Sequence, residues 1–258
     1  MNAISTRVDI PSLKGRVATA EWQARVELAA CYRLVAHQGW TDGMGTHIAA
    51  RVPDEDGHFL LNPVGLFFHE VTASSLIKVD FDGRILTETD FRLNSGGLAI
   101  HGAVFMARPD INASIHTHTE AGMAISVLDC RLLSITPVSL RFHKRIGYHD
   151  YFGQAGEFDD RDLIGKDLGG NNALIMKNHG LLTVGETMGD AFVDMCALEA
   201  ALKAQLRAMS TGYKIVVPPE EVCDRAAGNR ARKNSRTNAE DWKAWLRVAA
   251  SLDPSYRD

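Results

Sequence analysis

The stretch Ile111-Asn-Ala-Ser-Ile-His-Thr-His-Thr119 has the pattern of a buried strand that ends in two histidines. Side chains alternate between the two faces of a strand, so His116 and His118 point the same way. Two imidazoles on one face form a two-point chelate for a divalent metal ion. We therefore expect the rest of the chain to be arranged around this pair.

A second short apolar run also ends in a histidine. In Ala173-Leu-Ile-Met-Lys-Asn-His-Gly180, His179 precedes a glycine that permits close backbone approach. His179 is the predicted third ligand, and three neutral imidazoles would leave a coordination position open for water or substrate. The alternative is that all three are ordinary polar strand ends with satisfied hydrogen bonds. The repeated pattern of strand and histidine favours the metal site.

The composition is that of an ordinary globular protein, with 258 residues of which 45% are hydrophobic and 23% charged. A net charge of -4 provides no basic field for nucleic acid, and the basic run 230–236 is expected to be a solvated linker. The four cysteines are widely spaced, and no segment has the pattern of a signal peptide or a membrane span. We expect a cytoplasmic protein with reduced thiols and without nucleic-acid or membrane partners.

Hydrophobic periodicity and turn signals predict a mixture of helices and strands. Helices are expected at 19–37, 98–107, 124–127, 163–168, 186–209 and 238–252. Strands are expected at 47–52, 58–63, 76–80, 84–86, 111–119, 132–137, 173–179 and 181–185. The first four strands are expected to form two antiparallel hairpins, because each pair is joined by a turn that contains Asp and Gly.

The chain is divided into an N-terminal arm (1–19), a main domain (20–210) and a C-terminal tail (211–258) with a terminal helix. The arm and the tail contain apolar residues with little independent core to bury them. We therefore expect these residues to cover subunit contacts. They are Ile10, Leu13, Trp242, Trp245 and Leu246.

Five short segments occur in an order that resembles the class II aldolase and adducin head-domain family. They are Asn62-Pro-Val-Gly-Leu66, Val71-Thr-Ala-Ser-Ser75, Ala107-Arg-Pro-Asp110, Ile115-His-Thr-His-Thr119 and Lys177-Asn-His-Gly180. The resemblance covers residues 20–210 and is greater to the adducin-like branch than to the sugar-phosphate aldolases, because of Glu70–Ser75 and Tyr148–Tyr151.

The resemblance implies a three-layer α/β/α fold with a mostly antiparallel central sheet. It also implies a divalent metal ion on His116, His118 and His179, with zinc as the expected ion and manganese or iron as alternatives. A small-molecule substrate and a homotetramer with active sites at subunit interfaces are further implications of the same resemblance.

The chain departs from the phosphate aldolases at the helix before the metal strand. In those enzymes a Ser-Ser-Glu sequence opens this helix, and its glutamate is both a metal ligand and the acid/base residue. The corresponding places here are Ser95, Gly96 and Gly97, so the carboxylate and one phosphate-binding hydroxyl are absent. The Thr-Gly that helps to hold phosphate corresponds to Val64-Gly65. These departures predict a substrate that is not a phosphosugar.

The expected activity is that of a metal-dependent carbon-carbon lyase acting on a small oxygenated acid or aldehyde. A Lewis-acid metal stabilises the enolate that remains after carbon-carbon cleavage. Decarboxylation requires no base to remove a hydroxyl proton first, so it tolerates the missing glutamate better than retro-aldol cleavage does. Two alternatives are a non-catalytic adducin-like assembly module and an iron-dependent oxygenase on the same three histidines.

Several other residues are predicted to act beside the metal. His101 lies one helical turn after Gly97, so we expect it to face the same pocket and to exchange protons near neutral pH. Tyr151 is the next candidate for the acid/base role. For both, a packed polar side chain is the alternative interpretation. Substrate contacts are expected from His47, Asn62, Gly65 and Ser95.

Overall fold

The computed structural model describes residue 8 and residues 10–150, 161–231 and 234–258. Seven strands form one mixed sheet in the order β4-β2-β1-β6-β9-β8-β7. Their bounds are β1 His47–Arg51, β2 His58–Leu61, β4 Ile77–Asp80, β6 Ala113–Thr117, β7 Gly147–His149, β8 Ala173–Met176 and β9 Gly180–Gly185. Strands β7 and β8 are parallel, and the other neighbouring pairs in this sheet are antiparallel. Strands β3 (Pro63–Val64) and β5 (Arg92–Leu93) form a separate antiparallel pair.

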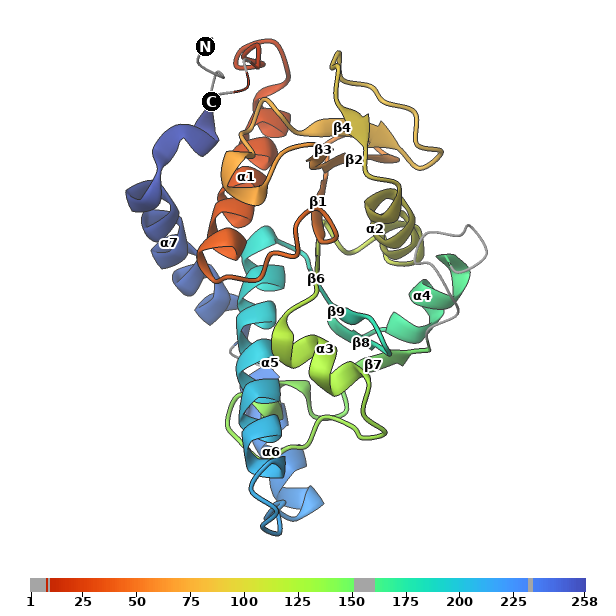
Figure 1. The fold of residues 1–258 in the computed structure, drawn as a ribbon, viewed down its shortest axis with the longest axis vertical. Helices are drawn as coiled ribbons and strands as arrows, with labels where there is room; N and C mark the ends of the chain where they lie inside the picture. The colour runs from red at the N-terminus through yellow and green to blue at the C-terminus, as the bar shows by residue number, and fades with distance from the viewer. Residues whose placement is uncertain (1–7, 9, 151–160, 232–233) are drawn as a thin grey trace, which may run out of the picture.

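Helices cover both faces of the seven-stranded sheet, which confirms the predicted α/β fold with a mostly antiparallel sheet. One face is covered by α1 (Thr19–His37) and α5 (Met188–Met209), against which α7 (Asn234–Leu252) packs, and the other by α2 (Ser95–Ala107) and α4 (Arg161–Leu168) (Figure 1). The other helices of the described residues are α3 (Glu120–Ser126) and α6 (Glu220–Ala231), together with the 3-10 segments Phe68–Glu70, Ser139–Phe142 and Pro254–Arg257.

Alternation along the central strands divides the interior into two hydrophobic cores. Ile48 and Ile115 are fully buried in the core on the side of α1 and α5. Ala49 and Leu182 are fully buried in the core on the side of α2. His116 follows Ile115 and therefore lies on the α2 side, at the end of β6. The ends of the central strands thus hold polar side chains at defined spacing.

The register between β1 and β6 brings two histidines side by side. His47, at the start of β1, is paired directly with His116. Directly opposed residues in an antiparallel pair have their side chains on the same face of the sheet. His47 and His116 are therefore adjacent on the α2 side of the sheet.

Two predicted strands differ from the structure. The segment 132–137 is not a strand, because its backbone turns: the N–H groups of Ile135 and Thr136 both donate to the hydroxyl of Ser139. The segment 84–86 contributes only one isolated bridge, from Ile85 to Val79. The helix α6 in the tail was not predicted, because its sequence has no strong apolar periodicity.

The C-terminal tail packs against the main domain of the same chain. Trp242 is 7% exposed, and its ring centroid lies 5.7 Å from that of Phe192 in α5. A Cβ on Gly189 would lie 2.6 Å from Cγ of Trp242, so only glycine permits this helix contact. Trp245 also contacts Phe192, at 5.4 Å between ring centroids. Trp242 therefore has a core within its own chain, contrary to the expectation, and the role of the arm and tail residues in subunit contacts stays a prediction. The division of the chain into arm, domain and tail stays a prediction.

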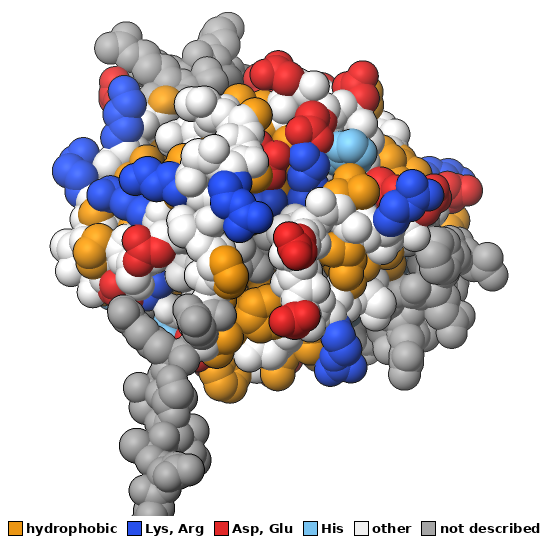
Figure 2. Space-filling view, turned by 90° about the horizontal axis from the view of Figure 1, so that it is seen from above, with side chains coloured by type: hydrophobic (Ala, Val, Ile, Leu, Met, Phe, Trp, Pro, Cys, Tyr) orange, Lys and Arg blue, Asp and Glu red, His pale blue; other side chains and the backbone are white. Residues whose placement is uncertain are grey.

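Figure 2 shows basic, acidic and apolar side chains interspersed on the face seen from above. This mixture agrees with the small net charge of the sequence. Among the described residues, no helix is both long and apolar enough to cross a membrane.

Candidate metal centre

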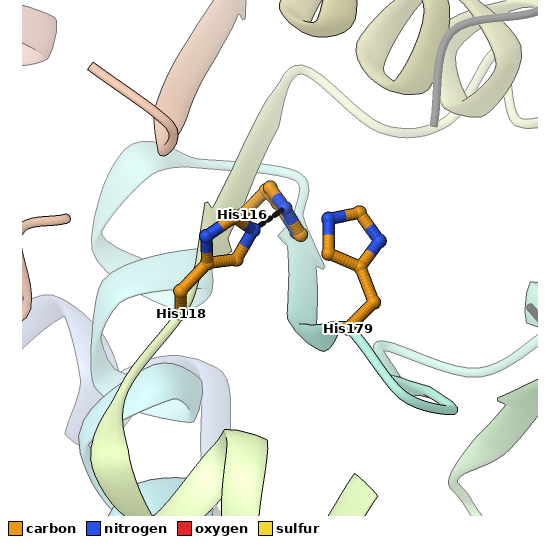
Figure 3. Close-up of side chains that lie close together, drawn as sticks. All are labelled: His116, His118 and His179. Atoms are coloured by element: carbon orange, nitrogen blue, oxygen red, sulfur yellow. Dashed lines mark hydrogen bonds between the residues drawn. The ribbon is translucent and has the colours of Figure 1, made fainter. Parts of the chain in front are cut away.

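Three histidine side chains converge at one end of the central strands of the sheet (Figure 3). His116 is the second-last residue of β6, His118 follows that strand, and His179 lies in the turn between β8 and β9. One ring nitrogen from each histidine can be chosen such that all three lie within 4.8 Å of one another. The sequence-predicted ligands are thus brought together by the fold.

Two of the rings are held in defined orientations by their Nδ1 atoms. Nδ1 of His116 lies 2.9 Å from the carbonyl oxygen of Leu181, and Nδ1 of His118 lies 3.0 Å from the Oδ2 atom of Asp42. A carbonyl and a carboxylate only accept, so each Nδ1 carries a proton and donates. This is the arrangement in which a histidine presents an unprotonated Nε2 atom to a metal ion.

The two Nε2 atoms of His116 and His118 lie 2.9 Å apart. If both rings are neutral and both Nδ1 atoms donate, both Nε2 atoms present lone pairs to each other. Facing lone pairs repel, whereas a cation that both atoms bind removes the conflict. The donor set therefore fits a divalent metal ion that accepts imidazole nitrogen.

The backbone around His179 explains the Asn-His-Gly sequence. Asn178 has φ of 54°, a left-handed conformation that asparagine tolerates better than most residues. A Cβ on Gly180 would lie 2.4 Å from the carbonyl oxygen of Thr117 and 3.0 Å from Cδ2 of His118. Glycine is therefore required where β9 approaches β6 beside the metal ligands.

Burial keeps two of these imidazoles, His116 and His179, neutral. The pKa of His116 is lowered well below its ordinary value, first by burial and then by the neighbouring rings of His47, His179 and His118. The pKa of His179 is lowered to about 4, first by burial and then by His118 and His149. Unprotonated rings are the form that binds a metal ion.

A second group of buried polar side chains adjoins the triad. The Nε2 atom of His101 lies 2.9 Å from Nδ1 of His47, and Nδ1 of His101 lies 2.8 Å from Oγ of Ser114. The ring centroids of His47 and His116 are 4.9 Å apart. His101 is in α2, as expected, but both of its ring nitrogens contact protein side chains, and the ring that lies 4.9 Å from that of His116 is the ring of His47.

The other candidate residues have different settings. Asn62 is buried, and its Oδ1 atom accepts a hydrogen bond of 2.8 Å from the hydroxyl of Tyr32. Gly65 is exposed with φ of 108°, and Ser95 is exposed at the first position of α2. Tyr151 lies outside the described residues. The roles of all four in substrate binding or catalysis stay predictions.

Sequence reasoning missed several polar groups around the ligands. Asp42 lies in the glycine-rich turn before β1, and Ser114 lies two residues before His116 on the same strand face. Strand alternation could have identified Ser114. Glu199 in α5 was also missed: its buried carboxylate accepts from the hydroxyl of Thr119 at 2.6 Å and so anchors the residue that follows His118.

The α/β/α architecture and the histidine cluster together define a class II aldolase-type protein with a candidate metal site. The chain belongs to the family described as "Class II Aldolase and Adducin N-terminal domain", whose profile matches residues 26–206. This confirms the family resemblance that the five segments predicted.

The similarity extends over nearly the whole chain in some relatives. A Caulobacter vibrioides protein named "Putative aldolase class 2 protein" is 42% identical over 248 residues, which cover 96% of each chain. The alpha-adducin of Rattus norvegicus is 41% identical over 190 residues, which cover 72% of this chain but only 26% of adducin.

Solved structures have the same fold. An aldolase II superfamily protein from Pseudomonas syringae has a TM-score of 0.92 and 41% identity, and the match covers 96% of this chain and 100% of that one. The L-fuculose 1-phosphate aldolase from Glaciozyma antarctica has a TM-score of 0.83 and 26% identity, with coverage of 98% and 97%.

Proposed function

We propose that this protein is a metal-dependent carbon-carbon lyase that acts on a small oxygenated acid or aldehyde and needs no phosphate group on its substrate. The observation that carries the proposal is the convergence of His116, His118 and His179, with the Nε2 atoms of the first two 2.9 Å apart. The family relationship to proteins named as class II aldolases supports the lyase class.

His116, His118 and His179 would hold the metal ion, and zinc is the ion that three imidazoles favour, with manganese or iron as alternatives. A divalent ion bound there supplies Lewis-acid polarisation of a substrate oxygen. Asp42 and the Leu181 carbonyl hold two of the rings in the ligating tautomer. The Glu199 to Thr119 hydrogen bond fixes the backbone just beyond His118.

The absence of a phosphate requirement rests on particular positions. Gly97 supplies no carboxylate, and a Cβ at this position would already lie 3.2 Å from Cγ of His47 and from Cδ2 of Leu61. Gly96 and Val64 carry no hydroxyl group. A site with fewer hydroxyl donors and no glutamate at position 97 favours decarboxylation, or retro-aldol cleavage with a relocated base, on a substrate without phosphate.

An adducin-like assembly module is the second candidate, and the similarity to alpha-adducin favours it. A module of that kind gains nothing from three converging imidazoles, two of which, His116 and His118, have Nε2 lone pairs that face each other. Burial of polar groups in an unsatisfied arrangement costs stability. The side-chain and carbonyl contacts that orient His116 and His118 therefore favour the metal-dependent enzyme.

Elemental analysis of protein purified without added metal tests this function. We expect about one divalent ion per chain, removal of the ion by a chelator, and loss of turnover that added zinc or manganese restores. Substrates are sought among 2-oxo, 3-hydroxy and aromatic hydroxy acids, with carbon dioxide and aldehyde release measured separately. A chain that binds no divalent ion supports the assembly module, and consumption of molecular oxygen with bound iron supports the oxygenase.

A further inference from the structure

Three buried polar side chains form a hydrogen-bonded series that ends beside the triad. It begins at the hydroxyl of Ser114 in β6, continues through His101 in α2 and ends at His47 in β1, with distances of 2.8 Å and 2.9 Å. Ser114 and His101 have no exposed surface, and His47 is 3% exposed. His47 is paired with His116 in the β1 to β6 register, so the last member of the series stands next to a metal ligand.

The buried hydroxyl of Ser114 determines where the protons of this series lie. Among the described residues, Nδ1 of His101 is its hydrogen-bond partner. If His101 carried its proton on Nδ1, the Ser114 hydroxyl hydrogen would have no acceptor, which is unfavourable in a buried position. The hydroxyl therefore donates to Nδ1 of His101, whose Nε2–H donates to Nδ1 of His47. The remaining proton of a neutral His47 is then on Nε2.

The position of the His47 ring indicates what its Nε2 proton can bind. Its ring lies where a side chain on residue 97 would start, since a Cβ there would be 3.2 Å from Cγ and 3.4 Å from Cβ of His47. Nδ1 is directed toward His101, so Nε2 is the ring nitrogen on the side away from it. Position 97 therefore has no carboxylate, and an imidazole with an N–H donor lies against it instead.

We propose that His47 donates a hydrogen bond from Nε2 to an anionic oxygen of a small acid bound at the histidine triad, and that Ser114 and His101 are positioning residues that fix its tautomer. This inference rests on the proposed function and narrows its substrate to acids. His47 keeps its proton throughout, so it stabilises negative charge on the substrate without transferring a proton. An N–H donor that needs no reorganisation is most effective at such a site.

Nitrogen NMR of histidine-labelled protein tests the tautomers directly, in both the zinc-loaded and the metal-free protein. We expect His47 and His101 each to show a protonated Nε2 and an unprotonated Nδ1, with the signals assigned by their loss in His47→Asn and His101→Asn. Ser114→Ala removes the hydroxyl and should give mixed tautomers at both rings. Ser134→Ala is the matched control, because Ser134 contacts Nδ1 of His143 at 2.7 Å in another part of the chain.

A proton on Nδ1 of His47 in the unmodified protein overturns the inference, whatever the behaviour of the variants. The same conclusion follows if Ser114→Ala folds and leaves both tautomers unchanged. Neither measurement depends on turnover. A chain that fails to bind zinc contradicts the proposed function, while the tautomers of the metal-free protein still test the hydrogen-bonded series.

Binding of oxalate to the zinc-loaded protein tests the donor role. His47→Phe keeps a ring in this space but removes the N–H, so oxalate should bind about tenfold more weakly while zinc content stays unchanged. His47→Gln can place an N–H donor nearby and should recover part of the affinity. Equal oxalate affinity in the unmodified protein and His47→Phe, at equal zinc content, overturns the donor role.

Discussion

The ring of His47 occupies the space into which a side chain on Gly97 would extend. A Cβ built on Gly97 would lie 3.2 Å from Cγ of His47, which is closer than ordinary van der Waals contact. Gly97 is in the first turn of α2, where its N–H donates to the side chain of Asn94. The glycine is therefore a steric requirement of the histidine beside the triad, and the two residues form one unit.

Gly97→Ala should lower the free energy of unfolding by about 1 kcal/mol, because overpacking outweighs the gain in helix propensity. Gly102→Ala is the matched control on the same helix, since a Cβ there meets nothing within 4 Å beyond the local backbone. That variant should gain up to about 1 kcal/mol. Urea unfolding of both variants measures the difference. An equal gain in unfolding free energy in both would show that the His47 ring can move aside without cost.

Gly97→Glu should not create stronger aldol cleavage. The added side chain must displace His47 or Leu61, and its carboxylate would compete for the open coordination position at the triad. We expect lower turnover on any acid substrate that screening identifies, with the metal still bound. A gain in aldehyde-releasing activity would show instead that the missing glutamate alone limits aldol chemistry, and would contradict the preference for decarboxylation.

His118→Ala should remove most of the bound metal while leaving the fold intact. The ring is partly exposed at the end of β6, so its loss leaves the hydrophobic cores unchanged. His37→Ala is the control, because His37 is an exposed residue at the end of α1. Elemental analysis and circular dichroism of both variants provide the readout. Unchanged metal content in His118→Ala would show that the ligand assignment is wrong.

Asp42→Ala should weaken metal binding by about 10- to 100-fold, because the carboxylate holds His118 in its ligating tautomer. Competition with a chromogenic chelator measures the affinity. Asp129→Ala removes another exposed carboxylate and should leave the affinity unchanged. Equal affinities for the two variants would mean that Asp42, which is itself largely exposed, does not orient the ligand.

The metal ligands could be predicted from the sequence because each depends on local pattern alone. Strand alternation places His116 and His118 on one face, and a run of apolar residues followed by His-Gly marks His179. The residues around them could not be predicted, because they depend on strand register and on helix packing. His101 does follow Gly97 by one turn, yet the β1 to β6 register places His47 between it and the triad.

Tertiary contacts also explain the errors in the fold. The segment 132–137 has the composition of a strand, but Ser139 and Thr136 bind each other's backbone and side-chain groups and hold the chain in a turn. The apolar tail residues looked available for a neighbouring subunit because the close contact between Gly189 and Trp242 is invisible in the sequence. Local pattern predicts elements, whereas their partners are set by long-range packing.

The homotetramer with interfacial active sites stays a prediction that rests on the family resemblance. Burial of Trp242 within the chain removes one reason for it, so the test must be direct. Light scattering at micromolar concentration should report four chains. A monomer under these conditions would count against assembly and against active sites at subunit interfaces.

The buried His101 should make the metal-free protein less stable in mild acid. Its pKa is lowered to about 3, first by burial and then by the nearby His116 ring, whereas an unfolded histidine has a pKa of about 6.5. Between these values the unfolded chain binds the proton and the folded chain does not. The stability contributed by neutral His101 is therefore complete above about pH 6.5 and is lost as the pH falls toward 3. Lowering the pH from about 7.5 to about 5.5 should cost about 1.4 kcal/mol for this residue alone.

His101→Gln cannot be protonated, so its unfolding free energy should fall by that much less over the same interval. His37→Gln, which changes an exposed histidine, should follow the unmodified protein. Urea unfolding of the chelator-treated proteins at both pH values measures the difference. Identical losses in the unmodified protein and His101→Gln would show that His101 is protonated in the folded state, and that the neutral series from Ser114 to His47 does not exist.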